Sequence, residues 1–272
     1  MLFLHLFYLS HSIEGKGERM IGLFNSDQRM SDCIKYLHDE AFLIDENTKD
    51  CSCCKVFVLP MSGISQGCVF LKGKRIDISH LLAQLSSDCV VISGRRCEEL
   101  ELLSQRVVIL DEVEEFVEVN AELTAEGVLY YLLDNKKLAL NQLHVDLLGY
   151  GHCGKAIYHL LRSLNVNVRV VRRQVRHESD QFICLETYRH CQPSQVIINT
   201  SIVNWLDDFL LAKLKPETLI INIVGFLAFN ESLIREKYSR LLHLKALPAM
   251  VASESAALML AKIINKEIEH GR

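Results

Sequence analysis

The sequence predicts an α/β protein built on doubly wound parallel sheets. Short runs rich in β-branched residues alternate with segments whose apolar residues recur at helical spacing. This alternation occurs twice, before and after a longer helical segment, which predicts two parallel sheets. In the second half, one strand leads straight into a glycine-rich turn and then a helix, the start of a βαβ unit.

The composition limits the classes of protein to consider. Hydrophobic residues make up 49% of the 272 residues and charged residues 24%, which is typical of a soluble globular protein with a large core. The formal net charge of -4 provides no general attraction to nucleic acid or acidic membranes, so we expect neither partner. The ten cysteines are scattered, which predicts free thiols in the cytoplasm and no metal site.

Residues 1–19 differ in character from the rest of the chain. The segment 1–13 is apolar but too short to span a bilayer, and it lacks the basic start and cleavage site of a signal peptide. The Gly-Glu-Arg sequence before Met20 is what a purine-rich ribosome-binding site would give if it were translated. We therefore expect residues 1–19 to be a non-native or disordered extension, with Met20 as the natural start.

The first half contains the elements of a small flavodoxin-like domain, expected over residues 20–122. The predicted strands are 21–24, 56–60, 89–93 and 107–110. The predicted helices are 31–40, 78–85 and 96–103. The acidic runs at 98–101 and 111–115 are interpreted as solvated faces.

The second half repeats the pattern and predicts a Rossmann-type domain over residues 123–252. A helix at 124–137 links the halves, and helix 154–164 follows the glycine turn. The predicted strands are 143–148, 168–171, 196–199, 219–224 and 243–247. A closing helix, within 253–272, is expected to pack back on the first domain.

The glycine turn carries the strongest functional signal. The sequence Gly149-Tyr150-Gly151-His152-Cys153-Gly154 matches G-x-G-x-x-G and lies between an apolar strand and a helix. The first glycine permits a tight turn, the second allows a pyrophosphate to approach the backbone, and the third lets helix and strand pack closely. The free N–H groups at the helix N-terminus favour phosphate. The turn therefore predicts a dinucleotide site.

The end of the next strand favours NADP(H) over NAD(H). Enzymes that use NAD usually carry an acidic residue there, whereas this chain has Arg172 and Arg173. Guanidinium groups can hold a 2′-phosphate through charge-assisted hydrogen bonds. NAD remains possible, since the arginines are also compatible with a solvated turn.

A third polar segment follows the strand at 196–199. Asn199, Thr200 and Ser201 fall at the sheet edge where the nicotinamide half of a dinucleotide lies in such folds. They are candidate cofactor contacts, and ordinary loop capping explains them equally well.

With these motifs in place, the chain resembles the oxidoreductase subunit of dipicolinate synthase, a family of sporulation enzymes. The likeness lies in the order of short segments from Met20 onward rather than in any single motif. The segments are Ser26-Asp27-Gln28-Arg29, Leu59-Pro60-Met61-Ser62, Ser93-Gly94, Thr124-Ala125-Glu126-Gly127, the glycine turn, and Ile198-Asn199-Thr200.

The resemblance implies a function and a set of substrate residues. The family converts a dihydrodipicolinate-type precursor to pyridine-2,6-dicarboxylate with a flavoprotein partner subunit. By this resemblance Arg29 would bind the small dicarboxylate substrate, and Ser62 and Ser93 would contact the substrate or the nicotinamide amide. Asp27 is a candidate for proton transfer, although capping of the next helix is the commoner role for such a residue. A homodimer is plausible for such enzymes.

The chain departs from the family pattern at places that would contact a substrate. Residues 224–229 are apolar where the family has an arginine and a glycine-rich loop, and residues 247–253 are poor in glycine. Two alternatives therefore stay open. One is another two-domain dehydrogenase of the 2-hydroxyacid or amino-acid type, although no histidine–carboxylate pair follows the last strands. The other is a non-catalytic NADP-binding partner subunit.

Overall fold

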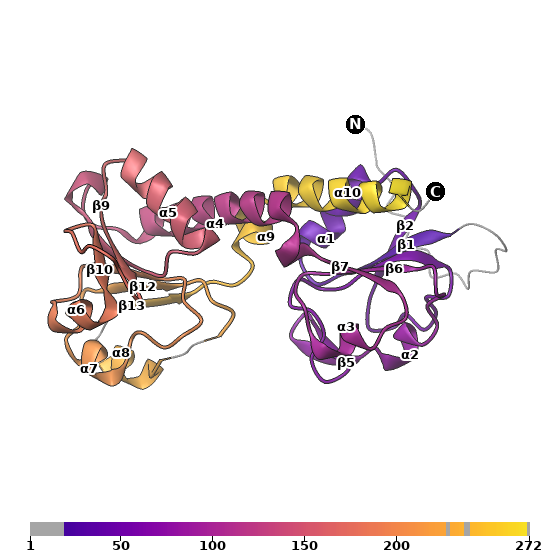
Figure 1. The fold of residues 1–272 in the computed structure, drawn as a ribbon, viewed down its shortest axis with the longest axis horizontal. Coiled ribbons are helices and arrows are strands. Elements are labelled where there is room, and N and C mark those ends of the chain that lie inside the picture. The colour runs from indigo at the N-terminus through magenta and orange to yellow at the C-terminus, as the bar shows by residue number, and fades with distance from the viewer. Residues whose placement is uncertain (1–18, 227–228, 237–239, 271–272) are drawn as a thin grey trace, which may run out of the picture.

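The computed structural model describes residues 19–226, 229–236 and 240–270. The expected extension therefore lies outside the described residues except for Arg19. Figure 1 shows two lobes, one formed by the first half of the chain and one by the second. Helix α10 (Ser253–His270) lies along the first lobe, and helix α4 (Glu114–Asn135) runs from there to the second. Each lobe contains one parallel sheet, which confirms the predicted fold class.

The first sheet has the flavodoxin strand order. Its parallel strands lie in the order β2-β1-β3-β6-β7, which corresponds to 2-1-3-4-5 once an inserted hairpin is set aside. The strands are β1 (Met20–Phe24), β2 (Ala41–Ile44), β3 (Cys54–Val58), β6 (Val90–Ser93) and β7 (Arg106–Ile109). The hairpin consists of β4 (Cys68–Leu71) and β5 (Lys74–Asp77).

The helices of this lobe are short. Helix α1 (Gln28–Cys33) begins earlier than the predicted helix 31–40, because the Asp27 side chain accepts a hydrogen bond from the Met30 N–H at 3.3 Å. It continues as the 3₁₀ turn η1 (Ile34–Tyr36), and strand β2 begins just beyond the end of the predicted helix. Helices α2 (Ser79–Leu82) and α3 (Glu98–Glu101) lie within the predicted helices.

Helix α4 (Glu114–Asn135) joins the lobes and begins well before the predicted helix 124–137. The acidic pair Glu114 and Glu115 forms its first turn, where the positive end of the helix dipole favours carboxylates. With 22 residues the helix is about 33 Å long. This length takes the chain from the 3₁₀ turn η2 (Leu110–Glu112) of the first lobe to the second sheet.

The second sheet has the Rossmann strand order. Its strands lie in the order β10-β9-β8-β11-β12-β13, which corresponds to 3-2-1-4-5-6, and all neighbours are parallel. The strands are β8 (His144–Leu148), β9 (Asn167–Arg172), β10 (Phe182–Cys184), β11 (Val196–Asn199), β12 (Leu219–Asn222) and β13 (Arg240–His243). The helices are α5 (His152–Ser163), α6 (Leu185–His190), α7 (Asp208–Ala212) and α8 (Glu231–Glu236).

The predicted last strand, 243–247, is wrong. Strand β13 ends at His243, and Ala246 has a φ of 54° in the left-handed region, which stops any extended continuation. Helix α9 (Leu247–Val251) starts at the next residue, with Pro248 in its first turn, where a missing N–H costs nothing.

Helix α10 (Ser253–His270) returns the chain to the first lobe. Its buried side chains, among them Leu260 and Ile264, share a core with Ile21 and Met30. Asn265 pairs with the backbone on both sides of Leu37: its Nδ2 donates to the Tyr36 carbonyl at 3.0 Å, and its Oδ1 accepts from the His38 N–H at 3.1 Å. In the described part of the chain, no helix is both long and apolar enough to cross a membrane.

A buried carboxylate organises one face of the second sheet. Asp146, on the central strand β8, is fully buried. It accepts hydrogen bonds from Arg169 Nε at 2.8 Å, Tyr188 Oη at 2.9 Å, the Ser194 N–H at 2.7 Å and Ser194 Oγ at 2.8 Å. These donors, which come from three separate segments, compensate the desolvation of one charge.

We expect Asp146→Asn to lower the free energy of unfolding by about 3–5 kcal/mol, because it leaves the partly buried Arg169 guanidinium without its carboxylate. Urea denaturation followed by circular dichroism measures the change. The control is Asp134→Asn on the exposed face of α4, which should change stability by less than about 0.5 kcal/mol. Equal effects of the two substitutions would contradict the assigned role of Asp146.

Candidate dinucleotide-binding site

The glycine turn lies where the strand order of the second sheet reverses. Strands β8 and β11 are neighbours there, and their connections leave in opposite directions. Gly149, just after β8, has a φ of 104°, and a Cβ at this position would lie 2.4 Å from Thr200 Oγ1. The N–H and Oγ1 of Thr200 both donate to the Leu148 carbonyl, at 2.9 and 3.0 Å. Only glycine permits this backbone path.

The other two glycines differ in what surrounds them. A Cβ on Gly154 would lie 2.5 Å from the Gly149 carbonyl oxygen, so its absence lets α5 pack against the turn. A Cβ on Gly151 would meet nothing within 4 Å. The space beside Gly151 adjoins the N-terminus of the 12-residue helix α5, whose first N–H groups have no partner within the helix. This geometry fits a pyrophosphate.

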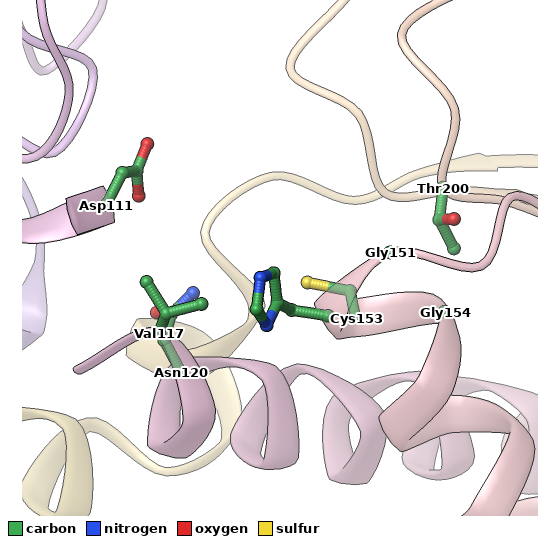
Figure 2. Close-up of a pocket in the computed structure, with 8 residues that line it drawn as sticks. Asp111, Val117, Asn120, Gly151, Cys153, Gly154 and Thr200 are labelled. Atoms are coloured by element: carbon green, nitrogen blue, oxygen red, sulfur yellow. The ribbon is translucent and has the colours of Figure 1, made fainter. Parts of the chain in front are cut away.

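A cavity of about 280 Å³ lies between this turn and the first lobe. Figure 2 shows the two walls, with the turn and Thr200 on one side and Asp111 on the other. The residues that line it are Asp111, Val117, Asn120, Gly151, His152, Cys153, Gly154 and Thr200. Residues of the glycine turn and of the segment after β11, both predicted to contact a cofactor, therefore line one cavity.

Cys153 lines this cavity as a protonated thiol. Burial raises the pKa of its thiol, and a hydrogen bond with the Thr124 side chain acts in the opposite direction. Because a thiol with a raised pKa is a weak nucleophile at neutral pH, Cys153 is suited to packing rather than to covalent chemistry.

Asp111 is a candidate site residue that the sequence pattern does not reveal. The pattern favours a solvated face for residues 111–115, and Asp111, Glu112, Glu114 and Glu115 are indeed exposed. Asp111 also faces the cavity, where partial burial raises the pKa of its carboxyl group and the charge of Arg95 acts in the opposite direction. Within the described ranges its carboxylate has no hydrogen-bond or ion-pair partner. Its place shortly after strand β7, at the carboxyl edge of the sheet, is the signal that could have indicated it.

Arg172 and Arg173 lie exposed at the carboxyl end of β9, beside a second cavity of about 750 Å³. The Arg172 guanidinium carbon lies 5.6 Å from the ring centroid of Tyr150, which places that cation over the glycine turn. Among residues 19–226, 229–236 and 240–270, neither arginine pairs with a carboxylate. The second cavity is lined by Arg172, Gln174, Val175, Arg176, His177, Ser179 and Phe182.

Asn199 and Ser201 make internal hydrogen bonds. Asn199 Nδ2 donates to Asn222 Oδ1 at 2.7 Å, and Asn199 Oδ1 accepts from the Ser201 N–H at 3.2 Å. Ser201 Oγ in turn accepts from the Val203 N–H at 3.2 Å. Of the three predicted residues in this segment, Thr200 is the one that lines the cavity.

The substrate residues implied by the resemblance lie at the carboxyl edge of the first sheet, outside the lining of this cavity. Arg29 is 3% exposed, and its Nη2 donates to Asp27 Oδ2 at 2.9 Å. Ser93 is fully buried, and its Oγ donates to the Arg95 carbonyl at 2.8 Å. Ser62 is exposed, and its carbonyl accepts from Arg95 Nε at 2.5 Å.

These features define a class of fold: a flavodoxin-like lobe and a Rossmann lobe with a dinucleotide-type glycine turn facing the cavity between them. No protein-family model matches the chain, and no curated protein matches it.

Solved structures are similar over almost the whole chain. A subunit of dipicolinate synthase from Bacillus halodurans has a TM-score of 0.76 at 19% identity, covering 92% of this chain and 98% of its own. The corresponding dipicolinate synthase chain from Bacillus subtilis has a TM-score of 0.73 at 20% identity, covering 94% and 97%. D-lactate dehydrogenase with NAD+ from Lactobacillus jensenii has a TM-score of 0.58 at 12% identity, covering 93% and 96%. The resemblance to this dipicolinate synthase subunit is thus confirmed at the level of the fold.

We expect Gly151→Val to weaken NADPH binding by about tenfold or more, because the new side chain would fill the space that a pyrophosphate needs. The urea midpoint should change little, since a Cβ at this position meets no atom within 4 Å. Fluorescence titration with NADPH measures the affinity. Gly154→Val is the matched comparison and should lower stability as well. A Gly151→Val protein with wild-type affinity would contradict the assignment of the turn.

We expect the double substitution Arg172→Glu/Arg173→Glu to reverse the cofactor preference. Two carboxylates would repel a 2′-phosphate and accept hydrogen bonds from ribose hydroxyls, so the NADPH-to-NADH affinity ratio should fall by about tenfold or more. Parallel titrations with both cofactors give the ratio. Arg235→Glu on α8 is the control for the charge change and should leave the ratio unaltered. An unchanged ratio in the double variant would show that these arginines do not bind the 2′-phosphate.

Proposed function

We propose that the chain is an NADP(H)-dependent oxidoreductase. The observation that carries the proposal is the glycine turn at the switch point, with open space beside Gly151 and exposed arginines at the end of β9. In this proposal the backbone of the turn and the N-terminus of α5 hold the pyrophosphate. Arg172 and Arg173 hold the 2′-phosphate, and Thr200 lies beside the nicotinamide half.

The proposed substrate is a dihydrodipicolinate-type dicarboxylate. Two dipicolinate synthase structures support it, because they match both lobes with TM-scores of 0.76 and 0.73, against 0.58 for the D-lactate dehydrogenase. The bound nicotinamide would accept a hydride from the dihydropyridine ring, and a ring proton would leave to a base. Loss of one hydride and one proton converts the dihydro ring to pyridine-2,6-dicarboxylate. A flavoprotein partner subunit belongs to the same proposal.

Asp111 is better suited than Asp27 to accept that proton. The Asp27 carboxylate is already bonded to Arg29 Nη2 and to the Met30 N–H. Asp111 faces the cavity without a partner among the described residues, and burial raises the pKa of its carboxyl group toward the range useful for a base.

A non-catalytic NADP-binding subunit is the second candidate. The observation that favours it is the lining of the 280 Å³ cavity, because the described residues of that lining include no lysine or arginine to bind an acidic substrate. The segment after β12 is also apolar, and Asn222 Nδ2 fixes it by donating to the Val224 and Phe226 carbonyls at 3.1 and 3.2 Å. This candidate predicts NADPH binding without hydride transfer.

We expect the purified chain, supplied with its flavoprotein partner and NADP+, to form dipicolinate from the cyclic precursor. Ultraviolet absorbance of the product and of NADPH at their separate maxima measures the reaction. The control is the same reaction mixture without the chain, in which product formation is measured in the same way. Tight NADPH binding with no turnover would favour the non-catalytic subunit, and absence of both binding and turnover would reject both candidates.

We expect Asp111→Asn to lower kcat by about 100-fold or more, because an amide cannot accept the proton. In the wild type, kcat should rise with pH through the pKa of Asp111, which burial has raised, since only the carboxylate acts as a base. The variant should lose this rise. Glu114→Gln, exposed nearby on α4, is the control. A variant with the wild-type pH profile would show that another group takes the proton.

A further inference from the structure

Three loops at the carboxyl edge of the first sheet are bonded into one unit. They follow strands β3, β6 and β7, which are neighbours in the sheet. The Asp111 N–H donates to the Gly94 carbonyl at 3.0 Å, which joins the loops after β7 and β6. A Cβ on Gly94 would lie 2.2 Å from the Met61 carbonyl oxygen, so the loop after β3 packs directly on the loop after β6.

Arg95 is the residue that these loops hold in place. Its Nε donates to the Ser62 carbonyl at 2.5 Å, and its own carbonyl accepts from Ser93 Oγ at 2.8 Å. A Cβ on Gly63 would lie 3.3 Å from Arg95 Cγ, so the arginine side chain packs closely on this glycine. The backbone and the side chain of Arg95 are therefore both fixed, and the two serines implied by the resemblance act on Arg95.

The outer part of the Arg95 guanidinium has no partner in the part of the chain that the structure describes. The residue is exposed, and its Nη1 and Nη2 make no hydrogen bond or ion pair with any residue that the structure describes. Asp111 lines the cavity, and the positive charge of Arg95 acts to lower the pKa of its carboxyl group. The two side chains nevertheless lie beyond ion-pair distance of each other. The next residue, Arg96, differs, because Glu112 already accepts from both its Nε and its Nη2 at 2.9 Å.

An acidic substrate in this cavity would need a cation such as the Arg95 guanidinium nearby. Among the described residues that line it, Asp111 is the one carboxylate and no lysine or arginine is present, so a carboxylate ligand would be repelled unless a cation stood beside the opening. Arg29 is buried and paired with Asp27, so it is poorly placed for this task. A guanidinium with one edge anchored and the other free presents two parallel N–H donors, which match a carboxylate.

We propose that Arg95 is the anchor for a substrate carboxylate, on the wall of the first lobe opposite the glycine turn. The inference rests on the proposed function, since it takes the ligand to be a ring dicarboxylate. It adds the position of one carboxylate, beside Asp111, with Ser62 and Ser93 as the positioning residues for Arg95. The substrate ring then lies between Arg95 and the cofactor site.

The test is equilibrium binding of pyridine-2,6-dicarboxylate to the chain saturated with NADP+, measured by calorimetry. We expect Arg95→Met to weaken binding by about tenfold or more, as the loss of charge-assisted hydrogen bonds predicts. Arg95→Lys should recover part of the affinity, because it restores the charge without the fork. Arg96→Met is the matched control and should bind like the wild type. NADPH affinity should be equal in all variants, which verifies an intact cofactor lobe.

Picolinate and the neutral diamide of pyridine-2,6-dicarboxylate complete the panel. The anchor is supported if Arg95→Met loses binding of either acid while the diamide binds weakly and equally to the wild type and the variant. This result supports the anchor even if no turnover is found. Wild-type affinity of Arg95→Met for both acids overturns the inference and leaves the oxidoreductase proposal standing. Failure of the wild-type complex to bind either acid also overturns the inference.

Discussion

The second lobe depends on the contact between the ends of β8 and β11. Gly149 approaches Thr200 so closely that any side chain at residue 149 would overlap the threonine hydroxyl. This contact keeps the two central strands together where the chain reverses its direction across the sheet, and it sets the axis of α5. The tight junction places the N-terminus of α5, whose first N–H groups have no partner within the helix, beside the open space at Gly151. A larger residue at either outer glycine would separate strand, turn and helix.

The fold and the cofactor turn can be predicted from the sequence because their signals are local. The run Val196–Asn199 is a continuous apolar strand whose predicted and observed bounds agree, and the glycine spacing is sufficient to locate the switch point. Strand β2 escapes prediction because it is a short edge strand, with three of its four residues only partly buried, shortly after a helix whose end is not evident. The predicted start of helix α4 is too late because its acidic first turn has the composition of a solvated loop.

The substrate side cannot be predicted to the same extent, because its residues depend on tertiary contacts. Nothing in the sequence distinguishes Arg95 from Arg96, yet Glu112 pairs with Arg96, whereas Arg95 pairs with no carboxylate among the described residues. Arg29 and Ser93 carry suitable groups, but they are buried and already make internal hydrogen bonds. The site therefore combines a cofactor wall encoded by a short motif with a second wall assembled from three separate loops.

A crystal structure of the chain grown with saturating NADP+ most directly tests whether the glycine turn holds NADP(H). We predict the pyrophosphate over Gly151 at the N-terminus of α5, the 2′-phosphate within hydrogen-bond distance of Arg172 or Arg173, and the nicotinamide beside Thr200. A turn with no bound dinucleotide, or a dinucleotide bound away from this turn, would contradict the assignment.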